Sequence, residues 1–410
     1  MSLYIGVRVN LTSRERILKA VQHEETDRVP IDLGGTDCST IAIGPYRQLC
    51  EHLEIDARPI QIVDIAQQVV IVDDRVADQL GTDAKAIWHF PNQWRQDQAY
   101  DGKSVMYPAR FKPVTRENGD KEVLDRKGEA CLRMPAGGLY YDICSHALLQ
   151  ATDPSALDVY AHDFDSVDRP EWYDMPVDKL AQTVKQIRNN NDRALVGCFG
   201  GHVFQAGQYL RGWSEFLLDL AGNPTMAEGV MDRLVDAHMA AFDRYAETVY
   251  KHVDIIQVCD DVGMQNTTWI SPDTYRKLIK PYHRRLYQHI KQKTRLPLLL
   301  HSCGSVSTFI PDFIEIGVDI LNPVQYSADK MDLAFLKREF GKDICFWGGG
   351  IDTQKILPFG TPQQVSDEVK RCIDTLAPGG GFVFASVHNI TDGVPLENIL
   401  AAMNTVRSYG

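Results

Sequence analysis

Short apolar runs rich in β-branched residues alternate with amphipathic helical patterns along most of this 410-residue chain. The runs lie at residues 29–33, 84–88, 194–199, 254–259, 297–301, 319–324, 343–347 and 381–387. Strand and helix in alternation predict a parallel sheet, because each helix returns the chain to the end of the sheet where the next strand starts. Roughly eight such units predict an α/β fold of the (β/α)8 type, the TIM barrel.

Several helical patterns between these runs carry clear start signals. Thr12 and Glu15 form a capping box before a helix of about three turns, which we expect to close the bottom of the barrel. Ser271 caps a helix that begins at Pro272, and Pro281 should kink that helix or delay its start. Further helices are expected at 177–189 and 362–376, between the runs that predict strands.

Residues 90–141 follow a different pattern, with alternating polar and apolar positions in place of a helical period. Turn sequences at 117–120, 126–128 and 136–138 separate the alternating stretches, as is typical of antiparallel hairpins. We therefore expect a single barrel domain, residues 1–410, into which residues 90–141 insert an antiparallel β-subdomain.

Composition and charge argue against several classes of function. The formal net charge is −12 and no basic block is interleaved with aromatic residues, so we expect no nucleic-acid partner. The longest apolar runs are far shorter than the roughly 18 residues of a membrane span. The first residues lack the pattern of a secretion signal, and the nine cysteines show no paired spacing. We expect a cytoplasmic protein without membrane contact.

Reactive side chains follow several of the expected strands. They are Cys198, Cys259 with Asp260 and Asp261, His301 with Cys303, and His388. In a barrel of this type the functional residues lie at the carboxyl ends of the strands. Because His301 and Cys303 are two positions apart in an extended segment, their side chains project to the same side and can meet one ion. His, Cys and a third ligand with an open position describe catalytic zinc, whereas the alternative is a hydrogen-bonded pair without metal.

His388 is the expected third ligand on chemical grounds, with hydrogen bonding to a substrate as the alternative role. It follows the last expected strand, which in a closed barrel adjoins the first strand and faces the central pocket. Cys198, Cys259 and Cys345 compete for the same place, although a thiol inside a strand is more often part of the core. We therefore expect a metal site of His301, Cys303 and His388.

Two neighbouring carboxylates follow the strand expected at 254–259. Either Asp260 or Asp261 could serve as a metal ligand, a general base or a substrate anchor, and either could instead cap the next turn. Together with His388 they are the expected catalytic residues. The remaining residues expected to contact substrate are Gly200, His202, Gln265, Asn322, Gln325 and Gly349.

Several segments resemble the uroporphyrinogen decarboxylase superfamily, and the likeness extends from about residue 12 to residue 403. The segments are RERILKAVQHEETDRVPIDLGG, CDDVGMQNTTWISPDTYRKLIKPYHRRL, HSCGSVSTFIPDFIEIGVDILNPVQ and VHNITDGVPLENI. This resemblance implies a (β/α)8 barrel with its pocket at the carboxyl ends of the strands. Decarboxylases of the family carry an arginine-rich RQAGR segment after the first strand, whereas residues 33–37 contain no arginine. A substrate with many carboxylates would lack its partners here, even though His388 matches a pocket histidine of that branch.

The HSCG segment is similar instead to the zinc-dependent, corrinoid-linked methyltransferases, which include coenzyme M methyltransferases and O-demethylases. In the coenzyme M enzymes zinc binds a His, a Cys and a later Cys; His301 and Cys303 match, and His388 takes the place of the later cysteine. The resemblance implies methyl transfer between a small thiol, methyl ether or amine and a corrinoid. No corrinoid-binding DxHxxG segment is apparent, so the cobalamin would be carried by a separate protein.

Two alternative functions remain open at this point. One is stepwise decarboxylation of uroporphyrinogen, a lyase reaction that needs no metal. The other is a barrel that binds a small molecule or a metal without catalysis. The sequence also leaves open the direction of methyl transfer and the oligomeric state, for which a homodimer is one option.

Overall fold

The computed structural model of the chain describes residues 10–125, 128–159 and 172–410. Residues 1–9, for which we expect no secretion signal, lie outside this range, as do residues 126–127 of the turn expected at 126–128. No helix in the described ranges is long and apolar enough to cross a membrane. All nine cysteines are free thiols.

A seven-stranded parallel sheet forms the centre of the molecule, with its strands in the order β15-β14-β13-β12-β11-β10-β3. The strands are β3 (Ala84–Ile87), β10 (Ala194–Gly200), β11 (Ile255–Cys259), β12 (Leu298–His301), β13 (Ile320–Asn322), β14 (Cys345–Trp347) and β15 (Phe382–Val383). Each of them lies within or overlaps one of the expected runs. From β10 to β15, strands that follow one another in the sequence are also neighbours in the sheet. A series of right-handed β-α-β crossovers produces this order.

The segment of residues 30–34 closes this sheet into a barrel. On the β15 side the Asp32 N–H donates to the Phe384 carbonyl over 2.7 Å, and on the β3 side the Asp83 N–H donates to the Ile31 carbonyl over 2.7 Å. The strand expected at 29–33 is therefore reduced to one bridge, between Ile31 and Phe384. The predicted (β/α)8 barrel is confirmed, with an irregular segment in the place of its first strand.

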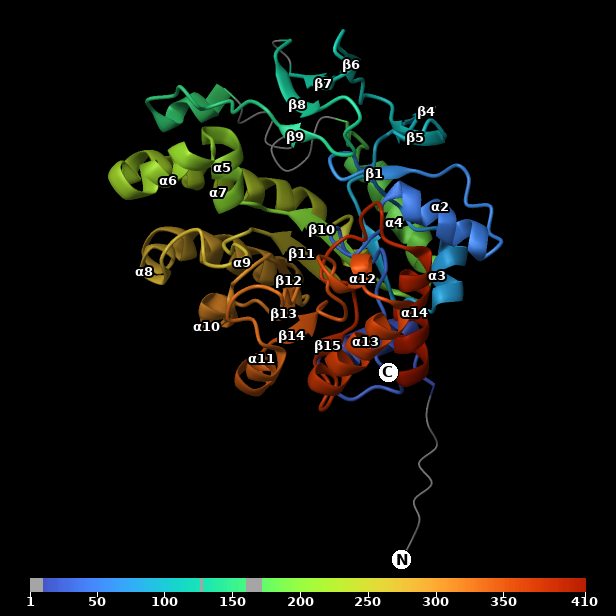
Figure 1. The fold of residues 1–410 in the computed structure, drawn as a ribbon. Coiled ribbons are helices and arrows are strands. Elements are labelled where there is room, and N and C mark those ends of the chain that lie inside the picture. The colour runs from blue at the N-terminus through green and yellow to red at the C-terminus, as the bar shows by residue number, and fades with distance from the viewer. Residues whose placement is uncertain (1–9, 126–127, 160–171) are drawn as a thin grey trace, which may run out of the picture.

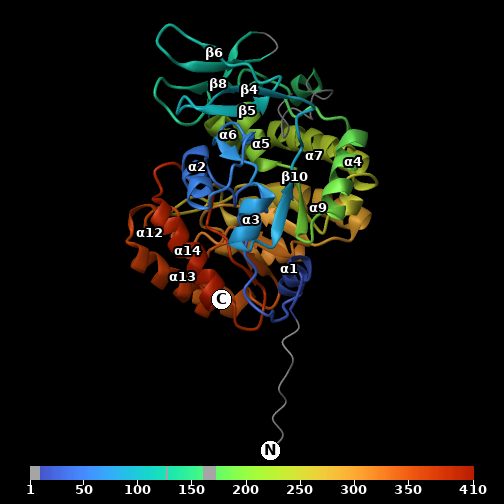
Figure 2. The ribbon, with the colours of Figure 1, turned by 90° about the vertical axis from the view of Figure 1, so that its right-hand side faces the viewer.

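Alternate residues of the strands point into the barrel, where they form a buried cluster with helix α1 (Ser13–Val21). The cluster consists of Ile17, Ala20, Val21, Ala84, Ala194, Val196, Ile255, Leu299, Ile320, Cys345, Trp347, Val383 and Ala385. The capping box of Thr12 and Glu15 starts α1 as expected. Figure 2 shows α1 below β10, at the end of the barrel away from the hairpins, and its buried residues join the interior cluster, so the prediction that this helix closes the bottom is confirmed.

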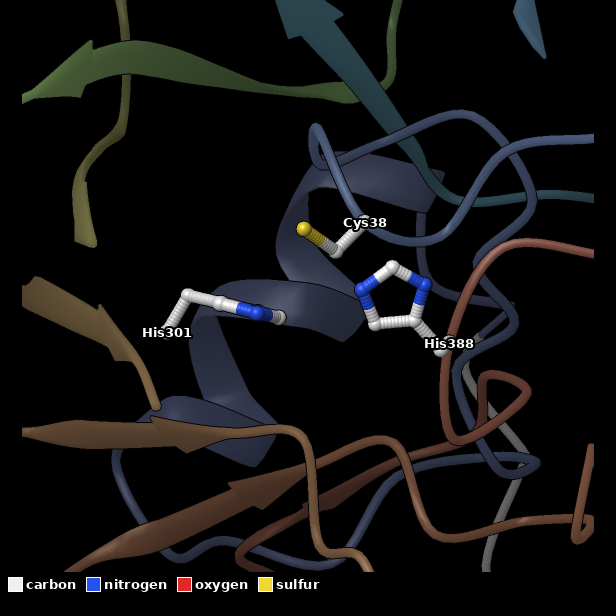
Figure 3. Close-up of side chains that lie close together, drawn as sticks. All are labelled: Cys38, His301 and His388. Atoms are coloured by element: carbon white, nitrogen blue, oxygen red, sulfur yellow. The ribbon is translucent and has the colours of Figure 1, made fainter. Parts of the chain in front are cut away.

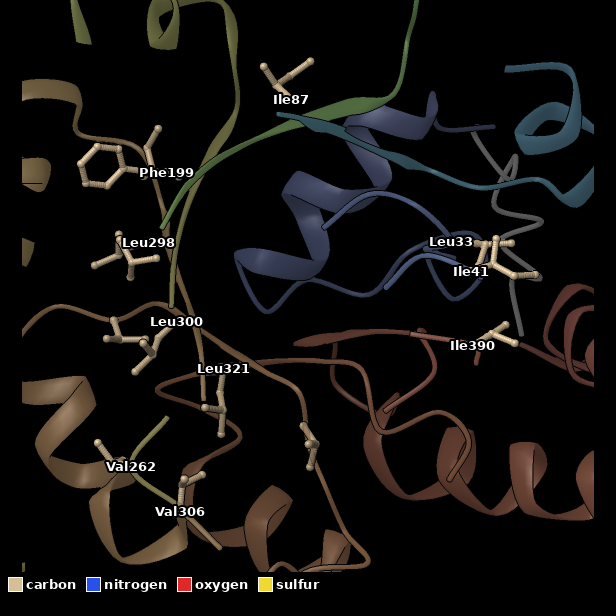
Figure 4. Close-up of a cluster of buried hydrophobic side chains, with 14 of the residues drawn as sticks. Leu33, Ile41, Ile87, Phe199, Val262, Leu298, Leu300, Val306, Leu321 and Ile390 are labelled. Atoms are coloured by element: carbon tan, nitrogen blue, oxygen red, sulfur yellow. The ribbon is translucent and has the colours of Figure 1, made fainter. Parts of the chain in front are cut away.

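Helices cover the outside of the barrel (Figure 1). They are α2 (Ile43–His52), α3 (Asp74–Leu80), α4 (Val177–Asn189), α5 (Phe204–Arg211), α6 (Trp213–Gly222), α7 (Pro224–Ala246), α8 (Pro272–Thr274), α9 (Lys280–Thr294), α10 (Ile310–Glu315), α11 (Leu333–Phe340), α12 (Ile356–Phe359), α13 (Pro362–Leu376) and α14 (Leu396–Tyr409). Leu298, Leu300 and Leu321 belong to the buried layer between strands and helices (Figure 4). Leu299, one position away, belongs instead to the interior cluster, which follows from the two-residue period of a strand.

The start of α9 follows the expectation from Pro281. The Ser271 side chain caps α8, and the chain then passes through a π-helix, Tyr275–Ile279, before α9 begins at Lys280. Pro281 lies in the first turn of α9, directly after the π-helix, and has no N–H to donate to the preceding turn. The proline thus delays the regular helix, as expected.

The inserted subdomain is antiparallel, and it leaves the barrel after the carboxyl end of β3. Strands β4 (Trp94–Gln98) and β5 (Ser104–Pro108) form one hairpin, and β6 (Val114–Thr115), β7 (Lys121–Leu124), β8 (Ala130–Met134) and β9 (Asp142–Ile143) form a four-stranded sheet. A further pair, β1 (Ile62–Asp64) and β2 (Val69–Val70), lies between α2 and α3. In Figures 1 and 2 the hairpins lie at the top of the view, at the end of the molecule away from α13.

Candidate metal and active site

His301 is the last residue of β12, and the pleat of the strand points it into the barrel. Leu299, two residues earlier, belongs to the interior cluster, so His301 lies one layer above it on the same side. In the sheet register His301 stands between Cys259 of β11 and Asn322 of β13. The imidazole therefore lies at the carboxyl end of the barrel and is 5% exposed.

Asn322 fixes which nitrogen of His301 can bind a metal. Its Nδ2 donates to the Trp347 carbonyl over 3.0 Å, which turns its Oδ1 toward His301 Nδ1 at 2.7 Å. Because that oxygen can only accept, Nδ1 carries the proton and Nε2 presents a lone pair. A neutral imidazole held in one tautomer in this way is the form that ligates metals.

One group of donors gathers at Nε2 of His301. The Cys303 Sγ lies 3.4 Å from this nitrogen, and Oδ1 of Asp261 lies 4.0 Å from it. The same carboxylate oxygen accepts the backbone N–H of Cys303 over 2.8 Å, which holds the loop after β12 in place. Gly304 then takes a φ of +87°, the left-handed region that favours glycine, and the chain turns away. Asp261, His301 and Cys303 have ligand atoms within 4.8 Å of one another.

A second group shares His301 and lies across the barrel mouth (Figure 3). Ligand atoms of Cys38, His301 and His388 lie within 4.8 Å of one another, and the rings of His301 and His388 are 5.6 Å apart at their centroids. The structure thus divides the expected trio of His301, Cys303 and His388 between two groups that share His301. Cys38 was not among the residues expected here, although its position a few residues after the first expected strand was a usable signal.

The barrel mouth favours the neutral forms of its donors. Burial, followed by the Asp261 and Asp37 carboxylates, raises the pKa of the Cys303 thiol, and burial likewise raises the pKa of Cys38. Burial and the neighbouring His301 lower the pKa of His388 from 6.5 to about 4. At neutral pH His388 is therefore an uncharged imidazole, and both thiols need a nearby cation before they ionise.

The two neighbouring aspartates have different surroundings. Asp260 is buried and accepts hydrogen bonds from the backbone N–H groups of Val203, Phe204 and Gln205, at 3.0, 2.7 and 2.7 Å, where α5 begins. His283 Nε2 lies 2.7 Å from Asp260 Oδ2. Burial by itself would raise the pKa of Asp260, but the hydrogen bond and charge of His283 outweigh burial and hold that pKa below its usual value. Asp260 is bound to α5 and α9, while Asp261 is the carboxylate that reaches the donors.

The two glutamines expected to contact substrate brace the loop after β12. Gln325 Oε1 accepts the Gly304 N–H over 2.8 Å, and Gln325 Nε2 donates to Gln265 Oε1 over 2.9 Å. Gln265 Nε2 in turn donates to the Ser327 carbonyl over 2.7 Å. The described contacts of these side chains therefore hold the loop that carries Cys303, as Asn322 holds His301.

The other residues expected to contact substrate lie at the turns that follow β10 and β14. Gly200 ends β10 with a φ of +85°. The carbonyl of His202 lies 2.8 Å from His238 Nε2. Gly349 has a φ of +77°, and a Cβ there would stand 2.8 Å from the Cβ of Val324, so close packing requires glycine at this point.

Two of the competing cysteines belong to a separate buried network next to the donors. Cys259 Sγ donates to Asp37 Oδ2 over 3.1 Å, and Cys198 Sγ donates to Gln257 Oε1 over 3.3 Å. Burial raises the pKa of both thiols. Cys345 is fully buried in the interior cluster below the mouth. None of the three belongs to a group of metal-ligand atoms in the described part of the chain.

The fold and the donors at the barrel mouth define an α/β-barrel protein with a candidate metal site. A profile of the family described as uroporphyrinogen decarboxylase (URO-D) matches residues 151–409. The chain belongs to the uroporphyrinogen decarboxylase family, which confirms the resemblance stated from its motifs.

Two relatives indicate the range of this family. The chain is 30% identical over 136 residues to a methylated-thiol–coenzyme M methyltransferase of Methanosarcina mazei, a match that covers 33% of each chain. It is 26% identical over 188 residues to a uroporphyrinogen decarboxylase of Nostoc punctiforme, which covers 45% of this chain and 48% of that one. The matched part thus spans between a third and a half of the length of these relatives.

A solved structure of a methyltransferase from Methanosarcina mazei shares the whole fold. It superposes with a TM-score of 0.60 at 17% sequence identity, over 97% of this chain and 99% of that one. At this identity the likeness supports the fold, and the fold agrees with the barrel expected from the sequence.

Proposed function

We propose that the protein is a zinc-dependent methyltransferase that moves a methyl group between a small substrate and a corrinoid carried by a separate protein. The single observation that carries the proposal is the set of donors around His301, in which a tautomer-fixed imidazole nitrogen lies 3.4 Å from the Cys303 sulfur. The match to a thiol methyltransferase of Methanosarcina mazei supports the same class of reaction.

The residues present fit zinc. Imidazole nitrogen, thiolate sulfur and carboxylate oxygen are the ligands that zinc takes in proteins, and the orienting contact of Asn322 is the kind of outer hydrogen bond that metal-ligating histidines make. We propose His301 and Cys303 as two ligands and His388 as the third, with Cys38 and Asp261 as the competing donors. Zinc bound there would act as a Lewis acid toward a substrate thiol or methyl ether.

The protein's own residues then have distinct tasks. Asn322 keeps the His301 lone pair directed into the mouth, and Asp261 holds the loop that carries Cys303. Among the described residues Asp261 is also the one carboxylate within 4.0 Å of His301 Nε2, so we assign it the role of accepting a proton from an arriving thiol. Asp260, bound to α5 and His283, positions the neighbouring backbone.

The open face of the mouth is the proposed approach for the partner. Because the donors lie at the carboxyl ends of the strands, a small substrate and a corrinoid delivered by another protein would meet the same face. We propose that this encounter takes place in the cytoplasm.

The charges around His388 argue against uroporphyrinogen as the substrate. Among the described residues, the groups whose charges act on the pKa of this histidine are His301 and two carboxylates, Asp261 and Asp37, and no arginine is among them. A porphyrinogen with many carboxylates would be repelled by these groups. The decarboxylase alternative is favoured by the family match and by the likeness to the decarboxylase of Nostoc punctiforme, but the charges at the mouth do not favour it.

Metal analysis combined with a transfer assay tests the proposal. We expect the purified protein to contain stoichiometric zinc and to transfer methyl groups between a methylated thiol or methyl ether and cobalamin. A His301→Ala, Cys303→Ala variant should lose both zinc and transfer, while Cys144→Ser, at an exposed thiol outside the donor groups, should keep both. A protein that cannot bind zinc, or a double variant with unchanged transfer, would sink the proposal. Formation of coproporphyrinogen would favour the lyase, and binding without turnover would favour a non-catalytic barrel.

A further inference from the structure

A cavity lies in the inserted subdomain, apart from the donors at the barrel mouth. Its volume is about 360 Å³, and except for Gln68 its lining comes entirely from residues 95–141. Pockets that hold small ligands in proteins usually measure about 300–1,000 Å³. The cavity is therefore large enough for a compact organic molecule.

The polar lining of this cavity is cationic, although the whole chain carries a net charge of −12. Arg95, Lys112 and Lys121 face it together with a single carboxylate, Asp97. Asp97 already accepts a hydrogen bond from Arg95 Nη1 over 2.6 Å. In the described part of the chain neither lysine makes an ion pair, although the charge of Lys121 helps to lower the pKa of Asp97, so one carboxylate offsets three cationic side chains and an excess of positive charge remains. An excess of positive charge in a hollow attracts small anions.

Arg95 also has unused bonding capacity. Besides the bond to Asp97, its Nη2 donates to the Phe111 carbonyl over 2.9 Å, and its Nε is buried with no acceptor among the described residues. A guanidinium offers five N–H donors, and a carboxylate can take two of them at once. The two bonds made by its Nη atoms hold Arg95 in a fixed position at the wall of the cavity, while its Nε still lacks an acceptor.

Aromatic rings form the apolar part of the wall. Phe111 lies between Tyr107 and Tyr141, with ring centroids 5.3 and 5.7 Å apart, and all three rings are buried. The Tyr107 hydroxyl is bound to Gln68, which fixes its ring. The rings of Phe111 and Tyr141 meet edge to face at 86°, those of Tyr107 and Phe111 are tilted by 42°, and aromatic rings in such arrangements can pack against another flat ring. One side of the cavity therefore suits an apolar, flat body and another side suits a negative charge.

We propose that this cavity is a binding site for a small aromatic carboxylate or a similar aromatic anion. The anionic group lies against Lys112, Lys121 and Arg95, and the ring packs on Tyr107, Phe111 and Tyr141. The proposal does not depend on zinc or on methyl transfer, because none of these residues belongs to the metal-donor groups.

Calorimetric titration with benzoate, with benzyl alcohol as the neutral probe of similar size, tests the site. We expect benzoate to bind and benzyl alcohol to bind about tenfold more weakly, because it lacks the charge-assisted bonds. Lys112→Gln combined with Lys121→Gln should weaken benzoate binding by at least about tenfold. The matched control is Lys103→Gln, an exposed lysine of the same subdomain that does not line the cavity, and it should bind like the wild type.

The location needs its own control, because a carboxylate could also bind a metal at the barrel mouth. The His301→Ala, Cys303→Ala variant should bind benzoate as the wild type does if the site is in the subdomain. The thermal midpoint of the lysine double variant should be unchanged, since neither lysine is engaged in an ion pair. Absence of saturable benzoate binding, equal affinity for benzyl alcohol, or binding that survives the lysine changes and disappears with the His301 change would each overturn the proposal.

Discussion

His301 and Asn322 stand side by side on neighbouring strands, and the 2.7 Å contact between Nδ1 and Oδ1 engages one imidazole nitrogen and leaves the other directed into the barrel mouth. The contact exists because the register of β12 and β13 aligns the two residues. Its orientation is set one strand further on, where Asn322 donates to the Trp347 carbonyl. The ligating atom of the candidate metal site is thus determined by backbone pairing across β12, β13 and β14.

Removal of this contact should weaken metal binding without loss of the ligands themselves. We expect Asn322→Ala to lower zinc affinity by about 10–100-fold, because His301 would lose the acceptor that fixes its tautomer and ring orientation. Competition with a chromophoric chelator measures the affinity. Asn398→Ala is the matched control, since Asn398 is equally buried but donates to the carbonyls of Leu357 and Gly360 away from the mouth. Equal zinc affinity in wild type and Asn322→Ala would contradict the assignment.

The two thiols near His301 can be distinguished with cobalt in place of zinc. We expect the Cys303→Ser variant to lose most of the thiolate-to-cobalt charge-transfer absorption, because Cys303 Sγ is the sulfur next to Nε2. Cys38→Ser should retain that absorption if Cys38 is only a neighbouring donor. The opposite result would make Cys38 the sulfur ligand in place of Cys303.

Substitution of the two adjacent aspartates should affect different properties, the stability of the fold at Asp260 and metal binding at Asp261. Asp260→Asn is expected to lower the free energy of unfolding by about 2–4 kcal/mol, because a buried carboxylate that caps α5 and pairs with His283 is lost. Asp261→Asn should leave unfolding nearly unchanged and reduce zinc affinity and transfer instead. Denaturant titration and metal competition on both variants measure the two effects, and a catalytic loss in Asp260→Asn at unchanged stability would speak against the structural role.

Asp32 should impose a pH dependence on stability. Burial raises the pKa of this carboxyl from 3.8 to about 6, although Trp347 Nε1 and the Gly35 N–H donate to it. The folded state therefore holds a proton that the unfolded state has released, so this group's contribution to stability is present below pH 4 and is lost as the pH rises through about 6. The loss amounts to at most about 3 kcal/mol.

Denaturant titrations between pH 4 and about pH 6 measure how the free energy of unfolding depends on pH, with the Asp32→Asn variant as the comparison. That variant should be less stable overall, since an amide offers one acceptor to two buried donors, but its unfolding free energy should vary less across the window. Identical slopes with pH in the two proteins would rule out Asp32 as the source.

The bottom of the barrel depends on another buried carboxylate. Asp83 has a fully buried side chain that accepts hydrogen bonds from Arg16 of α1, from Arg28 and from the Ile31 N–H of the closing segment. Asp83→Ala would leave two guanidiniums without their partner and should cost about 3–5 kcal/mol of unfolding free energy. Asp56→Ala, which breaks the exposed pair with Arg58, is the control and should leave the thermal midpoint unchanged. A small effect of Asp83→Ala would indicate that packing alone closes the barrel.

Most of the fold could be predicted from the sequence because its signals are local. The capping boxes at Thr12 and Thr361, and the apolar runs that became β11 and β12, depend only on neighbouring residues. The first strand could not be predicted in detail, because whether residues 29–33 form a ladder or a single bridge at Ile31 depends on how the barrel closes.

The candidate site was predictable only in part, for the same physical reason. His301 and Cys303 are two residues apart, so the period of a strand suffices to bring them together. The contribution of Cys38 requires barrel closure, and the role of Asn322 requires the register of two strands. The difference between Asp260 and Asp261 was within reach: the inward positions of β11 continue from Cys259 to Asp261, which leaves Asp260 directed toward the helices.

The closing segment determines how this pocket can change over evolutionary time. His301 stands on a central strand above a close-packed interior layer, so a different side chain there would disturb the residues beneath it. Cys38 belongs to the loop between the bridges at Ile31 and Ile41, and it lies outside the interior layer below His301. In a barrel of this kind a metal-binding side chain next to the closing segment can be exchanged while the rest of the molecule stays as it is. Chemical diversity would then accumulate beside that segment first.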